Sequence, residues 1–278
     1  MAGRQGTAGI VLVLLASLGL AACGGGGGGD HARTPAATPG SDAAATGTTA
    51  APVPSTATES TAAPASTASP ASPASPASPV DQLFGVGSAE QVLSVIADDY
   101  DQSTATLTAY ERDGTGWKQV FGPWPAHIGA KGFAPPDQKR EGDNRTPSGA
   151  YGFDFAFGVL ADPGVKLPYR PVTSSAIVWD DDPTSARYNQ WVDSSTQSAG
   201  DDPEPMYNTP AYNYGAVIDY NANRTPGLGS AIFLHVSKDG PTAGCVAIAQ
   251  DHLVEVLRWL DPAHKPRIIM GTHATVTP

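Results

Sequence analysis

The apolar residues of this 278-residue chain fall into two separate regions. One apolar run covers Ile10 to Leu20, and no comparable run follows until about Val80. From there the apolar positions come in short alternating stretches, separated by Gly, Pro, Asn and Asp. Short apolar stretches between turn residues favour strands over long helices. The pattern therefore predicts one folded domain over residues 81–278.

The first elements of this domain are predicted to be a helix and a hairpin. Ser88 begins a stretch with capping-box spacing and apolar residues that can share one face, which predicts a helix over 88–98. Residues 104–111 alternate β-formers, and an Asp-Gly turn returns the chain as a second strand over 117–121.

Further elements follow the same reasoning along the chain. Short strands are expected at 176–179, 216–220, 231–236 and 267–270. One helix is predicted over 251–260, with four inward residues: Leu253, Val254, Leu257 and Leu260. Few helices and many short strands predict a mainly β fold with a few short helices and long functional loops.

The apolar run near the N-terminus has the form of an export signal. Arg4 precedes it, and the run is shorter than the about 20 residues that a membrane span needs. It ends in Leu-Ala-Ala-Cys at 20–23, which resembles the bacterial lipobox, whose cysteine is lipidated and becomes the mature N-terminus. We expect a signal peptide over 1–22 and lipidation of Cys23. The alternative is an ordinary secretory signal, with Cys23 unmodified.

Residues 23–80 are almost entirely Gly, Ala, Pro, Ser and Thr. They contain very little that can be buried, so burial cannot offset the entropy of ordering them, and we interpret them as a tether. A flexible coil of this length spans roughly 40 Å and an extended polyproline II chain about 180 Å. The expected location is the outer face of the cell membrane, anchored through Cys23 and reaching into the cell wall.

The charge of the domain limits its partners. From Val80 onward there are 14 basic and 24 acidic side chains, a net charge of about −10. A nucleic-acid interface needs a basic face, and no basic cluster is present in the sequence. We therefore expect no nucleic-acid partner.

The cysteine count draws attention to one residue. The chain has two cysteines, and lipidation of Cys23 leaves Cys245 alone. Exported proteins usually pair their cysteines, so a lone thiol is either buried and inert or kept free for chemistry.

The sequence around Cys245 favours chemistry. His235 ends a predicted buried strand, a Gly-Pro turn follows, and Gly244 precedes the cysteine. A free thiol is only about 3% thiolate at pH 7, and an adjacent imidazolium lowers its pKa by up to about three units. We therefore expect an activated thiolate, with backbone N–H groups near Gly244 available to hold an oxyanion.

Two sequence blocks resemble the L,D-transpeptidase (YkuD-type) catalytic domain. The first is the strand histidine followed by Thr-Ala-Gly-Cys at 242–245, and the second is Lys-Arg-Glu-Gly-Asp-Asn-Arg-Thr-Pro-Ser-Gly at 139–149. The resemblance covers about 104–272. It implies a YkuD-like β-sandwich or mixed-sheet domain, no cofactor, and peptidoglycan stem peptides as partners.

The resemblance also implies roles for individual residues. Cys245 would be the nucleophile and His235 its base, oriented by the main-chain carbonyl of Val236. The N–H groups of Gly244 and Cys245 would form the oxyanion hole. The thiolate would attack the carbonyl between residues three and four of a stem tetrapeptide, release D-alanine and pass the acyl group to a second stem, giving a 3→3 cross-link. Carbapenem-type inhibitors would acylate the same sulfur.

The chain departs from the family pattern at two places. Ala243 stands where Ser-His-Gly-Cys has its histidine, and Ala247 stands where an Arg or Asn is commoner. Thr242 replaces the serine and stays a candidate for substrate binding. These changes leave nucleophile, base and oxyanion backbone in place and put substrate positioning in question.

Four further residues are candidates for the substrate groove: Arg145, Tyr188, Asn189 and Trp191. Arg145 can bind a stem-peptide carboxylate or brace its own loop against Asp143. The other three can line the groove or serve as core and turn residues. A metal site is not expected, because the His and Cys spacing matches no usual ligand pattern.

Two alternatives to a transpeptidase stay open. A hydrolase with the same thioester, an L,D-carboxypeptidase or wall amidase, would use water in place of the amine. A non-catalytic wall-binding lipoprotein would have kept the fold and lost the chemistry. Retention of both Cys245 and His235 argues against the latter.

Overall fold

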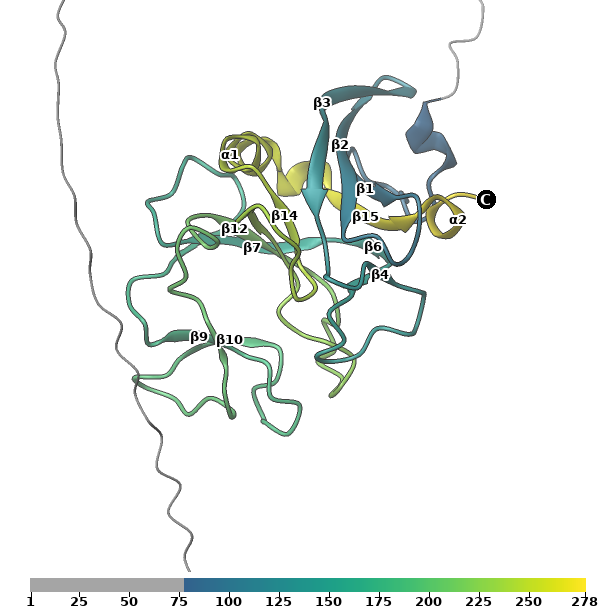
Figure 1. Cartoon of the computed structure of the whole chain (residues 1–278). Helices are drawn as coiled ribbons and strands as arrows, with labels where there is room; N and C mark the ends of the chain where they lie inside the picture. The colour runs from purple at the N-terminus through teal and green to yellow at the C-terminus, as the bar shows by residue number, and fades with distance from the viewer. Residues whose placement is uncertain (1–77) are drawn as a thin grey trace, which may run out of the picture. The chain divides into compact units, whose positions relative to one another are not determined.

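The computed structural model describes residues 78–278, which form a mainly β domain with two short α-helices (Figure 1). The predicted signal peptide, Cys23 and most of the tether lie outside the described residues. The main sheet has ten strands in the order β6-β15-β1-β2-β3-β14-β13-β12-β7-β8. Most neighbours are antiparallel, but β1–β15, β13–β14 and β7–β8 are parallel, so the sheet is mixed.

The strands of this sheet are β1 (Gln91–Ala97), β2 (Thr104–Asp113), β3 (Gly116–His127), β6 (Gly149–Tyr151), β7 (Phe153–Gly158), β8 (Tyr169–Pro171), β12 (Gly215–Ile218), β13 (Phe233–Val236), β14 (Val246–Ile248) and β15 (Arg267–Thr272). Two small sheets complete the β structure: β10 (Gln190–Asp193), β9 (Ile177–Asp180) and β11 (Glu204–Pro205) form one, and β4 (Phe133–Ala134) and β5 (Thr146–Pro147) the other. The helical segments are η1 (Pro79–Gln82), α1 (Gln250–Trp259), η2 (Pro262–His264) and α2 (His273–Val276).

The helix predicted over 88–98 is wrong. Residues 91–97 form β1, which pairs with β15 on one side and β2 on the other. Both faces of this central strand are buried. Its apolar residues therefore follow one another in the sequence without the alternation of a half-exposed strand, and this run was compatible with one face of a helix. β-branched residues such as Val92 and Val95 suit this position, and strand pairing outweighs the capping-box spacing of Ser88.

The predicted hairpin is confirmed. β2 and β3 pair antiparallel, with Asp113 opposite Gly116 across the turn. Gly114 in that turn has φ +58°, a conformation that glycine adopts without strain. The second strand runs further than predicted and ends at His127, which brings it beside β14.

Helix α1 is confirmed and lies over the half of the sheet that holds β12, β13 and β14 (Figure 1). Leu253, Val256 and Leu257 are buried, as is Leu260 just after the helix. Val254, predicted to face inward, is only half-buried, and Val256 takes its place. This packing fixes one face of the strands that precede and follow the candidate catalytic loop.

The small β9 sheet has its own apolar contact with the main sheet. Trp179 of β9 packs edge-on against Phe233 of β13, with ring centroids 5.0 Å apart. Phe157 and Tyr212 also contact Phe233 edge-on. This buried aromatic cluster fixes β9 and β11 close to the strand that carries His235. Within residues 78–278, no helix combines the length and the apolar character that a membrane span requires.

Candidate active site

His235 and Cys245 lie on neighbouring parallel elements at the centre of the main sheet. β13 carries His235, and Cys245 directly precedes β14. The parallel register places His235 opposite Ala247 and Leu234 opposite Val246. The two chemistry-bearing side chains therefore come from adjacent strands, joined by the loop 237–245.

The Cys245 thiol is deeply buried in this site. Its residue is 7% exposed, and its sulfur lies 3.2 Å from the Ala231 carbonyl oxygen, to which the thiol donates. The Phe233 N–H donates to the sulfur at 3.3 Å. Burial raises the pKa of the Cys245 thiol to about 12, and the Phe233 N–H opposes this only in part. The resting group is a neutral thiol.

The His235 ring is held in one orientation. Its Nδ1 lies 2.9 Å from the Val236 carbonyl oxygen, the partner that the family resemblance implies. A carbonyl can only accept, so Nδ1 carries the proton and Nε2 has a free lone pair. Tyr212 packs edge-on against the ring, with centroids 5.4 Å apart. Burial lowers the pKa of His235 to about 4, against the opposing effect of the Val236 hydrogen bond.

The structure shows the Cys245 thiol and the His235 ring without the direct contact that the expected thiolate–imidazolium pair needs. Among the described residues no hydrogen bond joins the Cys245 sulfur to the His235 ring, since the thiol donates to Ala231 instead. Both groups sit in low dielectric, where desolvation penalises each charged form.

The loop backbone around Cys245 is braced by two threonine hydroxyls. Thr242 Oγ1 donates to the Cys245 carbonyl at 2.8 Å, and Thr146 Oγ1 donates to the same oxygen at 3.2 Å. Thr146 in turn accepts the Gly129 N–H at 2.9 Å. Thr146 belongs to the second sequence block, so this hydroxyl connects the two blocks physically.

The oxyanion hole differs from the expectation. The Gly244 N–H donates to Thr242 Oγ1 at 3.1 Å and is therefore already occupied. No acceptor in residues 78–278 receives the Cys245 N–H, so this amide stays available. A side chain at Gly244 would place its Cβ 3.1 Å from the Arg145 carbonyl oxygen and 3.3 Å from Ile232 Cδ1. A side chain here would therefore displace its neighbours by a few tenths of an ångström, which glycine avoids.

His235, Cys245 and Thr242 line one pocket of about 350 Å³. No hydrogen bond from the described residues reaches His235 Nε2, so its lone pair is open to this pocket. The family-pattern departures Ala243 and Ala247 also line it, and Ala247 is 1% exposed beside His235. Any larger residue at 247 would stand next to the imidazole.

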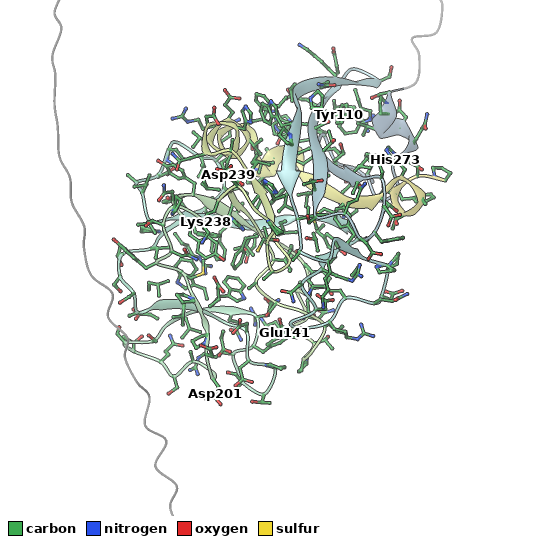
Figure 2. All side chains as sticks on the ribbon, in the orientation of Figure 1. Tyr110, Glu141, Asp201, Lys238, Asp239 and His273 are labelled. Atoms are coloured by element: carbon green, nitrogen blue, oxygen red, sulfur yellow. The ribbon has the colours of Figure 1, made fainter. Side chains whose placement is uncertain are left out.

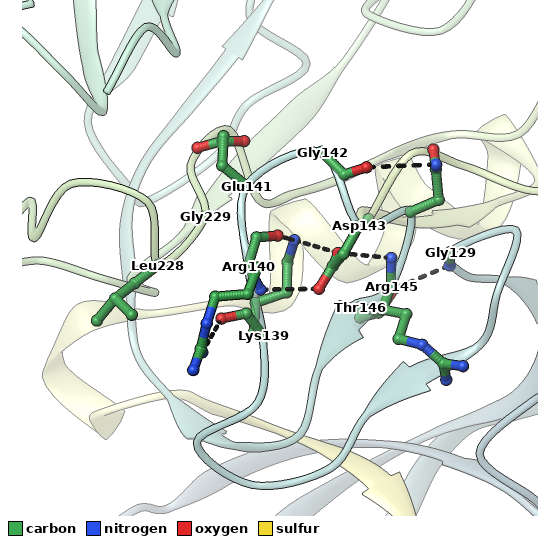
Figure 3. Close-up of polar contacts among 12 residues, drawn as sticks. Gly129, Lys139, Arg140, Glu141, Gly142, Asp143, Arg145, Thr146, Leu228 and Gly229 are labelled. Carbon is green, nitrogen blue, oxygen red and sulfur yellow. Dashed lines mark hydrogen bonds and ion pairs between the residues drawn. The ribbon is translucent and has the colours of Figure 1, made fainter. Parts of the chain in front are cut away.

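The second sequence block forms one wall of the pocket through its own network (Figure 3). Lys139 is buried and pairs with Asp143 at 2.7 Å. Asp143 also accepts the N–H groups of Arg140 and Arg145 at 2.8 Å and 2.9 Å. The Glu141 carboxylate points away from these contacts in Figure 3. The block is a rigid, internally paired loop.

Arg145 does not line the pocket, in contrast to its candidate role in substrate binding. Its guanidinium donates to the carbonyl oxygens of Phe133 and Tyr100, at 2.8 Å and 3.3 Å, and pairs with Asp101 at 2.8 Å. It braces its loop, although the side-chain partner is Asp101 and not Asp143.

The three candidates near residue 190 are also placed outside the pocket lining. Tyr188 donates to the Glu141 carboxylate, and Trp191 packs edge-on against Phe155. Asn189 has φ +57° and accepts the Trp179 indole N–H and the Ala231 N–H. All three support the structure around the site and do not form its surface.

The structure adds residues that sequence reasoning missed. Tyr212, Glu204 and Asp181 line the pocket from segments without any motif. Tyr212 donates to Glu204 Oε1 at 2.9 Å while contacting His235. No group of three or more His, Cys, Asp or Glu side chains suited to a metal occurs in residues 78–278.

Comparison with known proteins places this site in a family. The family model described as the L,D-transpeptidase catalytic domain (YkuD) matches residues 96–273. The chain therefore belongs to the YkuD family of L,D-transpeptidase catalytic domains, and its mixed β fold agrees with that membership.

The comparison with individual proteins is more distant. No curated protein matches the chain. One similar solved structure is the crystal structure of the helical cell shape determining protein Pgp2 from Campylobacter jejuni. It is 16% identical with a TM-score of 0.34, and the match covers 68% of this chain and 50% of that one. The chain thus corresponds to half the length of that protein.

Proposed function

We propose that this protein is a peptidoglycan L,D-transpeptidase that forms 3→3 cross-links through a thioester at Cys245. The observation that carries the proposal is the pairing of β13 with β14, which brings Cys245 and His235 into one pocket with the imidazole Nε2 unpartnered. Family membership supplies the substrate class, stem peptides of the cell wall.

The neutral resting pair fits a coupled first step. The substrate carbonyl carbon approaches the Cys245 sulfur, and the thiol turns from the Ala231 oxygen to His235 Nε2. The S–C bond forms as the proton moves to Nε2, so no isolated thiolate is needed and the cost of separated charge is avoided. The free N–H of Cys245 is placed to stabilise the oxyanion.

The remaining steps return the enzyme to its starting state. His235 gives its proton to the leaving D-alanine amine as the C–N bond breaks, which leaves a thioester on Cys245. A side-chain amine of a second stem attacks the thioester, and Nε2 takes the amine proton. The C–S bond breaks, the amide forms, and the sulfur recovers a proton from His235.

The experiment incubates the full chain with stem tetrapeptides and reads products by mass. The proposal expects a Cys245 adduct and a cross-linked dimer, with both lost in Cys245→Ala. His235→Ala is expected to slow adduct formation by about 10²–10⁴-fold, the usual range for a lost general base. Tripeptide without dimer would show that water is the acceptor and that the protein is a carboxypeptidase. No adduct with any stem peptide would overturn the proposal.

We also propose that Cys23 carries a lipid that holds the protein at the outer face of the membrane. Support comes from the Leu-Ala-Ala-Cys run after a short apolar segment and from the Ala/Pro/Ser/Thr/Gly composition that follows. The tether would let the catalytic domain reach the wall from its anchor.

A further inference from the structure

Three segments that are far apart in the sequence meet around the backbone of Cys245. They are the segment 128–132 between β3 and β4, the second sequence block with β5, and the Cys245 end of the loop 237–245. Gly129 of the first segment forms a parallel β-bridge with Thr242 of the loop. Two backbone hydrogen bonds of Thr242 with this segment, at 2.9 Å and 2.8 Å, hold the pair together.

The same segment is also paired with the second sequence block. The Lys131 N–H donates to the Asn144 carbonyl at 2.9 Å, and the Thr146 N–H donates to the Gly132 carbonyl at 2.9 Å. The approach is close, because a Cβ at Gly129 would lie 2.5 Å from the Asn144 carbonyl oxygen. This segment therefore joins the second sequence block to the catalytic loop.

One side chain connects all three segments. Thr146 is fully buried, and its Oγ1 accepts the Gly129 N–H at 2.9 Å (Figure 3). The same hydroxyl donates to the Cys245 carbonyl oxygen at 3.2 Å. A hydroxyl has one proton and two lone pairs, so it can make both contacts at once. The second sequence block therefore acts directly on the backbone of the nucleophile.

The backbone of Cys245 is held on both sides of its own N–H. Its carbonyl oxygen accepts from Thr146 and from Thr242, whose Oγ1 lies 2.8 Å away. Thr242 Oγ1 also accepts the Gly244 N–H at 3.1 Å, so the residue before the nucleophile is held as well. The Cys245 N–H between these contacts has no acceptor among residues 78–278. The two hydroxyls thereby fix the direction of the amide that is proposed to hold the oxyanion.

The outer part of the loop 237–245 lacks this support. Lys238 and Asp239 are exposed there, and their side chains form no ion pair within the described residues (labelled in Figure 2). Gly240 has no atom within 4 Å of its Cβ position. The orientation of the Cys245 amide therefore depends on the threonine contacts at the inner end of the loop.

We propose that Thr146 is a positioning residue for acyl transfer, which orients the Cys245 N–H toward the oxyanion by holding the Cys245 carbonyl. Both hydrogen bonds of its hydroxyl are made with backbone groups, so Thr146 acts through Cys245 and does not touch the reacting atoms. This inference rests on the proposed thioester chemistry. An oxyanion donor stabilises the transition state only when it points at the developing charge, so a small rotation of the Cys245 backbone weakens it.

Two reactions of the same sulfur separate this role from a purely structural one. Attack on an ester or amide carbonyl develops negative charge on the carbonyl oxygen, which a fixed N–H stabilises. Alkylation by iodoacetamide displaces iodide from a saturated carbon, so no oxyanion forms. Loss of the N–H orientation therefore slows acylation selectively, whereas damage to the pocket or a change in the thiol pKa affects both reactions.

The test uses the full chain and its variant Thr146→Val, which removes the hydroxyl and keeps the shape of the side chain. Each protein is treated with p-nitrophenyl acetate and, separately, with iodoacetamide over a range of pH, and initial rates are read from the mass of the Cys245-bearing peptide. Acylation of the variant by the ester is expected to be at least about 10-fold slower, less than the 10²–10³ typical of removing an oxyanion donor outright. The iodoacetamide rate and its pH dependence should stay within about twofold of the parent. Thr146→Ser keeps the hydroxyl and should restore acylation to within about threefold.

Ser148→Ala is the matched control. Ser148 is a buried hydroxyl of the same sequence block, and it donates at 2.7 Å to the carbonyl of Ala134, which lies in β4 and not in the catalytic loop. This variant should leave the ratio of acylation to alkylation unchanged. If Thr146→Val folds poorly, as judged by thermal melts, the smaller Thr146→Ala tests the same hydroxyl.

The outcomes distinguish this inference from the proposed function. Equal losses of acylation and alkylation in Thr146→Val, no loss of either, or a selective loss of the same size in Ser148→Ala would overturn the positioning role. A parent protein that the ester does not acylate would overturn it too, because no oxyanion would form there to be stabilised. Stem tetrapeptides are tested separately. Acylation by the ester without a stem-peptide adduct would refute the transpeptidase proposal and leave the role of Thr146 standing.

Discussion

Cys245 and His235 are 7% and 8% exposed, and this burial governs their protonation before any substrate arrives. The resting thiol keeps its proton and the imidazole stays neutral, so reactivity has to be created by the substrate. An ion-paired thiolate would instead react with any small electrophile near neutral pH. The pH dependence of Cys245 alkylation distinguishes a neutral thiol from an ion-paired thiolate.

Alkylation of Cys245 by iodoacetamide is predicted to be slow at pH 7 and to rise about tenfold per pH unit without a plateau below pH 10. The raised pKa, to about 12, leaves almost no thiolate in the neutral range. The measurement is the mass of the Cys245-bearing peptide as a function of time and pH. An exposed thiol made by Thr225→Cys in a Cys245→Ala background is the control, and it should level off above its ordinary pKa. Fast labelling of Cys245 near pH 6 would contradict the neutral pair.

At the scale of elements, the loop between β13 and β14 contains two glycines, Gly240 and Gly244, and only Gly244 lies close to neighbouring atoms. Gly244→Ala is predicted to lower stability by about 1–3 kcal/mol and activity by more than tenfold, because the new Cβ meets the Arg145 carbonyl at 3.1 Å and Ile232 at 3.3 Å. Gly240→Ala in the same loop is the matched control, since nothing lies within 4 Å of its Cβ position. Thermal melts and adduct rates of both variants are the measurements. Equal effects of the two changes would show that the loop is merely intolerant of any substitution.

Most elements were predictable because their signals are local. The β2–β3 hairpin and helix α1 follow from alternation, an Asp-Gly turn and a helical apolar face. The strand β1 was mistaken for a helix because a strand buried on both faces has no period of two, and short apolar runs do not distinguish the two states.

Only those residues of the candidate site that lie close together in the sequence could be predicted. His235 and Cys245 stand ten positions apart around a turn, so a motif can identify them. Asp181 and Glu204 reach the same pocket through the pairing of β9 with β11, and no sequence spacing records that contact. Arg145, Tyr188, Asn189 and Trp191 resembled groove residues by type, yet their hydrogen bonds and packing are used within the fold.

For the whole molecule, the proposed lipid anchor at Cys23 would decide where the YkuD domain works. Cys23→Ser is predicted to release the protein into the medium or to leave it unprocessed, because the serine hydroxyl cannot form the thioether to the lipid. Cell fractionation with immunoblotting measures the distribution, and Cys245→Ala, which keeps the anchor cysteine, is the control. Membrane retention of Cys23→Ser equal to that of the parent would refute lipidation at this site.

The buried neutral thiol has a consequence for the resistance of Cys245 to oxidation. Peroxide attacks thiolates, and successive oxidation to sulfinic acid is irreversible. Cys245 is the free cysteine in the described residues, so no neighbouring cysteine there can rescue it as a disulfide. Keeping the sulfur protonated and enclosed between Ala231 and Phe233 shields it from oxidants. Resting protein is therefore expected to resist millimolar peroxide far longer than the exposed Thr225→Cys thiol, with oxidation followed by peptide mass. The burial that keeps the Cys245 thiol neutral would therefore also preserve it through long exposure to oxidants.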